Sequence, residues 1–136
     1  MNVSCSTEIN DSVDEVWKRL STFEGVEAYL PIVTKSTVAG YGKGAKRTCE
    51  INLRNQVFQI RETVKEFDES NYSFVISMDD GPIQIRGMNF AFSLKDQGNK
   101  KTKITISTDL INPDAQFMAK NLFEMIGQGL KKIHEL

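Results

Sequence analysis

The sequence has little of the chemistry that metal centres and nucleic-acid binders require. It contains one histidine, His134, and two cysteines, Cys5 and Cys49, too few for a protein metal site. Its 17 Lys and Arg residues are balanced by 18 Asp and Glu residues, so it has no basic surplus that would attract a phosphate backbone. No apolar run approaches the roughly 20 residues of a membrane span. We therefore expect no metal, no cofactor, no nucleic-acid partner and no membrane-spanning segment.

The start of the chain also lacks a basic segment followed by an apolar one, so no secretory signal is visible and a cytoplasmic setting is expected. In that setting, Cys5 and Cys49, each on the apolar side of a predicted strand, are interpreted as free buried thiols in preference to a disulfide. A chain of 136 residues fits one domain, residues 1–136, that is large enough to bury a core. Monomer and homodimer both stay open.

The last 25 residues predict a long amphipathic helix. Asn112 is a good N-cap, Pro113 suits the first helical position, and Asp114 places negative charge in the first turn. Such a helix needs a surface to cover, because its apolar stripe is not stable in water alone. The stripe, at steps of three and four, consists of Ala115, Met118, Ala119, Leu122, Ile126, Gly129, Leu130 and Ile133.

The chain before this helix reads mainly as strands. Residues 3–9 alternate between apolar and polar side chains, and Ser12 with Glu15 forms a capping box that opens a helix carrying Trp17 on its apolar face. Gly25 ends that helix, and a short helical piece over residues 26–30 is stopped by Pro31. The glycine-rich run 40–44 precedes a strand and is therefore a turn, expected to be a mobile flap near a cavity mouth, and not a phosphate-binding loop.

Residues 46–63 predict a hairpin whose register can be derived. A two-residue turn at Arg54 and Asn55 makes the numbers of cross-strand partners sum to 109. One face of the hairpin is then apolar and must point inward, because a slip of one residue would separate its apolar pairs. The inward pairs are Leu53 with Gln56, Ile51 with Phe58, Cys49 with Ile60, and Arg47 with Glu62. An ion pair is thus predicted on the interior face.

Three further strands follow the hairpin. Their inward sets are Tyr72, Phe74, Ile76 and Met78; then Met88, Phe90, Phe92 and Leu94; then Ile104, Ile106, Thr108 and Leu110. Arg86 has the same parity as the apolar set that follows it, although a bulge at Gly87 would reverse its direction.

The order of strand, helix, short helix, six strands and long helix resembles the START-like (SRPBCC) superfamily, of the polyketide cyclase/dehydrase and lipid-transport type. The segments that carry this resemblance are residues 9–17, with a cap followed by Val16-Trp17, and residues 29–31, 44–47, 61–64 and 67–68. The resemblance implies an α+β helix-grip (Bet v 1-like) fold: a seven-stranded curved antiparallel sheet wrapped around the C-terminal helix, with two short helices after the first strand. It also implies an apolar cavity between sheet and helix. Residues 81–92 resemble the coenzyme-Q-binding and ribosome-association branch, but Ile83 departs from the aromatic that is typical there.

No nucleophile–base–orienter set can be assembled from these residues. Arg47 and Glu62 either satisfy each other structurally or form the polar end of a ligand cavity. The leading hypothesis is a binding or carrier protein for a small hydrophobic molecule such as a lipid, polyketide or quinone. The alternatives are a cyclase or dehydratase that uses Glu62 and Arg47, and a protein-interaction adaptor. The candidate ligand-binding residues are Arg47, Glu62, Cys49, Ile60, Phe74, Ile76, Met78, Arg86, Met88, Phe90, Phe92, Ile106, Met118, Leu122, Met125 and Ile126.

Overall fold

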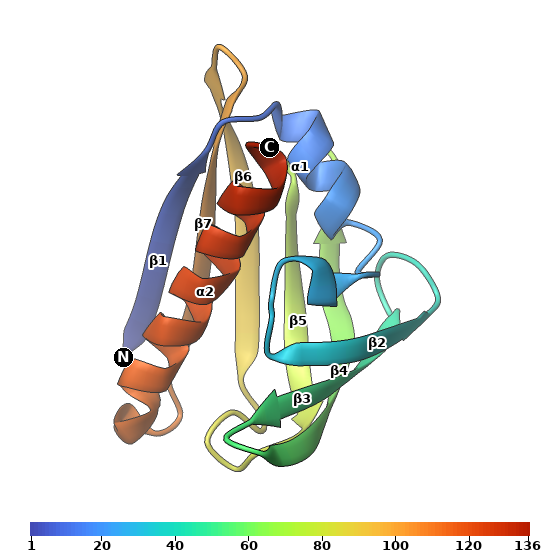
Figure 1. The fold of residues 1–136 in the computed structure, drawn as a ribbon, viewed down its shortest axis with the longest axis vertical. Helices are drawn as coiled ribbons and strands as arrows, with labels where there is room; N and C mark the ends of the chain where they lie inside the picture. The colour runs from blue at the N-terminus through green and yellow to red at the C-terminus, as the bar shows by residue number, and fades with distance from the viewer.

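Seven strands form one antiparallel sheet in the order β1-β7-β6-β5-β4-β3-β2, which curves around the C-terminal helix (Figure 1). The computed structural model describes residues 1–136. The predicted helix-grip fold is confirmed. Along the chain the elements are β1 (Asn2–Ile9), α1 (Val13–Leu20), the 3₁₀ turn η1 (Val26–Ala28), β2 (Val33–Ala39), β3 (Lys46–Leu53), β4 (Gln56–Asp68), β5 (Ser73–Asp80), β6 (Asn89–Gly98), β7 (Lys101–Asp109), the 3₁₀ turn η2 (Pro113–Ala115) and α2 (Gln116–His134).

The β3–β4 hairpin has the register predicted from the sequence. Arg47 pairs with Glu62, Cys49 with Ile60, and Ile51 with Phe58. Arg54 and Asn55 have φ values of 51° and 64°, which are the left-handed conformations that a tight two-residue hairpin turn requires. The alternation of apolar and polar residues therefore placed the hairpin correctly, and with it the inward ion pair.

Helix α2 is capped as predicted but is rotated relative to the predicted stripe. The Asn112 side chain accepts a hydrogen bond from the Asp114 amide, and one 3₁₀ turn precedes the α-helix. The buried side of α2 contains Ala119, Phe123, Ile126 and Leu130. Phe123, absent from the predicted stripe, is completely buried and packs edge-to-face on Phe90 with ring centroids 5.2 Å apart. Met118 and Met125 consequently lie at one edge of the buried side and are partly exposed.

Two glycines let α2 approach its neighbours closely along its C-terminal half. A Cβ atom on Gly127 would lie 2.2 Å from Thr7 Oγ1, and one on Gly129 would lie 1.7 Å from the carbonyl oxygen of Tyr29. Neither position has room for a side chain. The C-terminal half of α2 is therefore wedged between β1 and the segment after η1.

The end of α2 is tied to the loop between β1 and α1. His134 Nδ1 lies 2.7 Å from Asp11 Oδ2, and its Nε2 accepts a hydrogen bond from Arg19 Nε at 3.0 Å. The Asn10 amide donates to Glu135 Oε2 at 3.0 Å. His134 therefore fastens the end of α2 to the β1–α1 loop and to α1.

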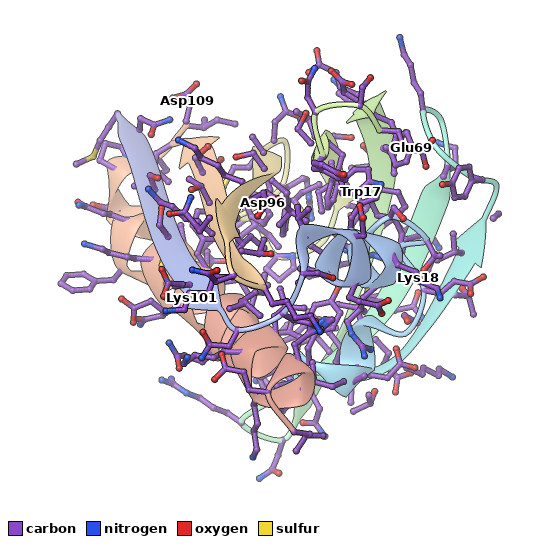
Figure 2. The ribbon with its side chains drawn as sticks, turned by 90° about the horizontal axis from the view of Figure 1, so that it is seen from above. Trp17, Lys18, Glu69, Asp96, Lys101 and Asp109 are labelled. Atoms are coloured by element: carbon purple, nitrogen blue, oxygen red, sulfur yellow. The ribbon has the colours of Figure 1, made fainter.

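Helix α1 packs through an aromatic cluster on the same face of the sheet as α2. Trp17 is buried and packs on Phe67 of β4 and Phe74 of β5, with centroid distances of 5.5 and 6.0 Å. Figure 2 shows Trp17 between α1 and these strands, with Lys18 at the outer side of the helix. The predicted core role of Trp17 is confirmed. Its buried indole N–H has no hydrogen-bond partner.

The helical piece predicted over residues 26–30 is present in a shorter form, as the single 3₁₀ turn η1. One local prediction is wrong. The 40–44 loop is not at a cavity mouth: Tyr41 donates a hydrogen bond to Glu69 Oε1 at 3.1 Å and stacks edge-on against Phe67. The loop thus lies beside the β4–β5 turn, at the opposite end of β3 from the β3–β4 turn.

None of the helices has the length and apolar character that a membrane crossing requires.

Candidate functional site

The inward side chains of β3 and β4 form a continuous row from the edge of the molecule to its interior. From the turn inward, the pairs are Leu53 with Gln56, Ile51 with Phe58, Cys49 with Ile60, and Arg47 with Glu62. At about 3.3 Å per residue, the six steps along the strand from Leu53 to Arg47 span roughly 20 Å. The row therefore runs from an exposed apolar rim to a buried ion pair.

The ion pair is bidentate. Arg47 Nε donates to Glu62 Oε1 at 2.6 Å and Arg47 Nη2 donates to Glu62 Oε2 at 3.1 Å. The Cys49 thiol also donates to Glu62 Oε1 at 3.5 Å. The side chains of Arg47 and Glu62 are only 11% and 6% exposed. Paired, hydrogen-bonded charges of this kind are the form in which buried charge is tolerated.

A strained segment of backbone supports the arginine. Arg47 Nη1 donates to the carbonyl oxygen of Phe23 at 3.2 Å. Phe23 has a φ of 62°, a conformation that is costly for a residue with a side chain. The buried Phe23 ring packs on Phe74, with centroids 4.8 Å apart. The connection after α1 is thus held so that its carbonyl reaches the guanidinium.

The surroundings fix the charge states of these groups. Although burial alone would lower the pKa of Arg47, the adjacent Glu62 carboxylate raises it well above its usual value, so the guanidinium stays charged. Burial, aided by Glu62 and opposed by the Arg47 charge, raises the pKa of the Cys49 thiol to about 12. Burial likewise raises the pKa of Tyr29. Because nucleophilic cysteines act as thiolates, Cys49 is unsuited to nucleophilic chemistry near neutral pH.

Next to the ion pair is a small apolar cavity. Its volume is about 60 Å³, and since one water needs about 10–15 Å³ of such space, it can hold a few waters or a head group of similar size. Its lining residues are Val26, Tyr29, Leu30, Val33, Arg47, Cys49, Ile51, Ile60, Glu62, Ile76, Met78, Ile85, Phe90, Phe92, Leu122 and Ile126.

A larger open groove adjoins this cavity at the surface. The groove has a volume of about 640 Å³, within the range of roughly 300–1,000 Å³ that is usual for small-molecule sites. Its walls come from the β3–β4 hairpin, the β5–β6 connection and the first half of α2. Four side chains line both spaces and therefore lie where the two adjoin, a boundary called the passage below: Ile51, Ile60, Ile85 and Leu122.

The groove opens at the end of the molecule opposite α1. In Figure 1 the β3–β4 hairpin, the β5–β6 connection and the start of α2 lie together at the lower end, whereas the C-terminal end of α2 lies near α1. Exposed apolar side chains gather in these three segments. They are Leu53, Val57, Ile83, Phe117, Met118 and Met125. Arg54 is the one charged residue that lines the groove.

Most of the residues predicted to contact a ligand line one of these two spaces. Met118 and Met125 line the outer groove, and Leu122 lines both spaces. Phe74, Met88 and Ile106 are buried core residues that line neither. The candidates at the inner cavity are Arg47, Cys49, Ile60, Glu62, Ile76, Met78, Phe90, Phe92, Leu122 and Ile126.

The inward placement of Arg86 is not found. Its side chain is 55% exposed, and its Nε and Nη2 donate to the carbonyl oxygen of Gly81 at 3.2 and 2.9 Å. The reason is a turn in which the amides of Ile85 and Arg86 both donate to the Pro82 carbonyl. This turn precedes β6 and directs the Ile85 side chain inward instead.

Sequence reasoning missed the part of the cavity wall that comes from non-repetitive segments. Val26, Tyr29 and Leu30 reach the cavity from η1 and the residues after it, and no alternating pattern marks them. Pro31, which ends this segment, was the available signal that an apolar loop was being fixed in place.

The polar groups of the site are those of the ion pair, the Cys49 thiol and Tyr29. No group of three or more His, Cys, Asp or Glu side chains is positioned to hold a metal ion. The one histidine is about the full length of α2 away from the start of that helix, tied to Asp11 and Arg19. A buried ion pair at the end of an apolar passage can bind one polar group of an otherwise apolar molecule.

A curved antiparallel sheet gripping a C-terminal helix over a cavity defines a protein of the START/Bet v 1 helix-grip class. The chain belongs to the polyketide cyclase/dehydrase and lipid-transport family, whose model matches residues 1–136. No curated protein matches it significantly in sequence.

Solved structures agree with this fold. An uncharacterised protein from Bacillus thuringiensis superposes with a TM-score of 0.85 at 15% identity, covering 100% of both chains. A START superfamily protein from Mycobacterium smegmatis gives 0.82 at 14% identity, covering 98% of this chain and 97% of that one. The Zhui aromatase/cyclase from Streptomyces sp. R1128 gives 0.78 at 12% identity, covering 99% and 93%. At these identities the likeness concerns the fold.

Proposed function

We propose that this protein binds, and carries, a small hydrophobic molecule whose body occupies the groove and whose polar end reaches the inner cavity. The observation that supports the proposal most strongly is that the two spaces adjoin and share four lining residues, Ile51, Ile60, Ile85 and Leu122. An apolar passage that ends at a hydrogen-bonding pair fits a molecule that is apolar along its length and polar at one end.

Binding of a neutral fluorescent naphthylamine dye tests this proposal. The wild-type protein should bind the dye with enhanced fluorescence, and Leu122→Trp, which fills the passage, should weaken binding. Phe117→Trp is the matched control, because Phe117 is on the same helix but 84% exposed and outside the groove lining. Equal dye binding by all three proteins, or none by the wild type, would contradict the proposal. Native mass spectrometry of protein purified from its own host would then identify the natural ligand.

A cyclase or dehydratase activity has less support from the site. Glu62 Oε1 accepts hydrogen bonds from both Arg47 and Cys49, and Oε2 accepts from Arg47. To receive a proton from a substrate, the carboxylate would have to give up a bond to Arg47. If the protein were such an enzyme, Glu62→Gln would abolish turnover while the substrate still bound.

A protein-interaction role is the second candidate, and the exposed side chains at the groove mouth favour it. Ile83 and Phe117 are 80% and 84% exposed, and apolar side chains gathered at one end of a molecule mark contact surfaces. A double Ile83→Ser, Phe117→Ser variant should then lose a partner while retaining the dye. Unchanged partner capture with this variant would remove the adaptor hypothesis.

A further inference from the structure

The inner cavity already contains a balanced pair of charges. The positive charge of Arg47 is matched by Glu62 through two hydrogen bonds. No other charged side chain lines the cavity, and its remaining walls are apolar apart from the Tyr29 hydroxyl and the Cys49 thiol. The cavity therefore has no net charge that could neutralise the charge of an ionised ligand group.

Arg47 nevertheless has hydrogen-bond donors to spare. A guanidinium has five N–H donors, and three of them go to Glu62 and to the Phe23 carbonyl. The Tyr29 hydroxyl, which also lines the cavity, shares a further hydrogen bond with Arg47, and what remains of the guanidinium donors has no protein acceptor. A donor without a partner in an apolar space is costly, so an acceptor placed there is stabilising.

On the basis of the function proposed above, we propose that the inner cavity selects a ligand whose leading end is an uncharged carbonyl, such as a ketone or quinone oxygen, over a carboxylate or an amine. The carbonyl oxygen accepts from the spare N–H groups of Arg47. The rest of the molecule follows as a slender apolar body through the passage into the groove.

The two charged alternatives fail for different reasons. A carboxylate would bring a second negative charge beside Glu62, where little water is present to screen it. An ammonium group would face the Arg47 charge, and Glu62 is already engaged through both oxygens. A carbonyl adds no charge and uses only the donors that are free.

The small volume of the inner cavity adds a second restriction. The ligand must pass Ile51, Ile60, Ile85 and Leu122 to reach a cavity of about 60 Å³. A space of that size accepts a head group of a few heavy atoms. Bulky phosphorylated or glycosylated head groups therefore stay outside.

The test compares three probes with the same chain length: methyl decyl ketone, dodecanoate and dodecylammonium, each below its micelle concentration, as competitors of the naphthylamine dye. The ketone should displace the dye at a concentration about tenfold or more below that of either ion, as expected for one hydrogen bond to a charged donor. Equal displacement by all three, or preference for an ion, would overturn the head-group selection alone. Failure of all three to displace the dye would overturn the binding function itself.

The variant Glu62→Gln should reverse the expected preference for the ketone over dodecanoate. Glu62→Gln removes the matching carboxylate and leaves the Arg47 charge free to bind dodecanoate in a bidentate manner. Dodecanoate should then displace the dye about as well as, or better than, the ketone. Arg54→Gln is the control, because it removes the only cation of the outer groove and should leave the order unchanged. An unchanged order in Glu62→Gln, or a reversal in Arg54→Gln, would contradict the proposal.

A spectroscopic readout on the wild-type protein keeps the proposal testable if Glu62→Gln does not fold. The infrared carbonyl band of a bound carbon-13-labelled ketone should lie at a lower frequency than the band of the same ketone in an apolar solvent. A band at the apolar-solvent frequency would mean that the oxygen meets no donor, and would overturn the proposal.

Discussion

Removing Arg47 should cost far more stability than removing an exposed cation from the same sheet. Arg47→Met keeps a similar volume but leaves the carboxylate of Glu62 buried, with the Cys49 thiol as its only remaining side-chain donor. Both charged side chains are about nine-tenths buried, and breaking a buried pair by removing one partner costs about 3–5 kcal/mol. That is a large part of the roughly 5–15 kcal/mol that stabilises a typical domain.

Urea unfolding followed by circular dichroism measures this loss. With a slope of about 2 kcal/mol per molar urea, the midpoint should fall by about 2 M. Lys35→Met is the matched control: Lys35 pairs with Glu50 across β2 and β3 at 3.6 Å, but it is 73% exposed, so its removal should cost less than about 1 kcal/mol. The double variant Arg47→Met, Glu62→Leu should recover most of the loss. A cost for Arg47→Met as small as that of Lys35→Met would refute the dry placement of the pair.

Three further predictions concern the frame that holds the site. Phe123→Ala should lower stability by about 3–5 kcal/mol because the ring is fully buried, whereas the half-exposed Met118→Ala should cost much less; similar urea midpoints would contradict the orientation of α2. Gly129→Ala should strongly destabilise or unfold the protein, since its Cβ would lie 1.7 Å from a backbone oxygen; an unchanged melting temperature would refute that contact. Burial alone would raise the pKa of Asp11, but hydrogen bonds from His134 and the Ser12 amide lower it below its ordinary value of 3.8. The ionised Asp11 therefore contributes its full stabilisation above pH 3.8, and this stabilisation is lost as the pH falls through the lower pKa of the folded state. Asp11→Asn should therefore be less stable than wild type at neutral pH, with the difference closing below pH 3.8; a pH-independent difference would count against the ionised contact.

The strands that build the site could be predicted because a period of two leaves few alternatives. Once Arg54 and Asn55 form the turn, moving the register by one residue would put Ile51 and Phe58 on opposite faces. The inward position of Glu62 follows from that constraint and needs no knowledge of the rest of the molecule. This is why the inward ion pair could be predicted from the sequence.

Other parts depend on contacts that no local pattern records. Ile85, and not Arg86, lines the cavity because both amides turn back to the Pro82 carbonyl. Parity arguments fail where a strand has not yet begun, and β6 begins only at Asn89. Tyr29 reaches the cavity because a glycine on α2 allows the helix to contact its carbonyl, which is a tertiary effect.

The orientation of α2 shows the same limit. Its sequence carries apolar residues over a wide arc, so periodicity alone identifies the helix but not which residues are most deeply buried. The close contacts at Gly127 and Gly129 fix the rotation. They bury Phe123 and turn Met118 and Met125 toward the groove.

Methyl NMR of the isoleucine- and leucine-labelled protein during titration with methyl decyl ketone tests the central claim most directly. The account predicts shifts at the passage methyls of Ile51, Ile60, Ile85 and Leu122, which line both the groove and the cavity. Ile9, fully buried at the end of β1 next to α1, should stay unchanged. Unshifted passage methyls, or shifts confined to the exposed Ile111, would show that the molecule binds outside the groove and would contradict the account.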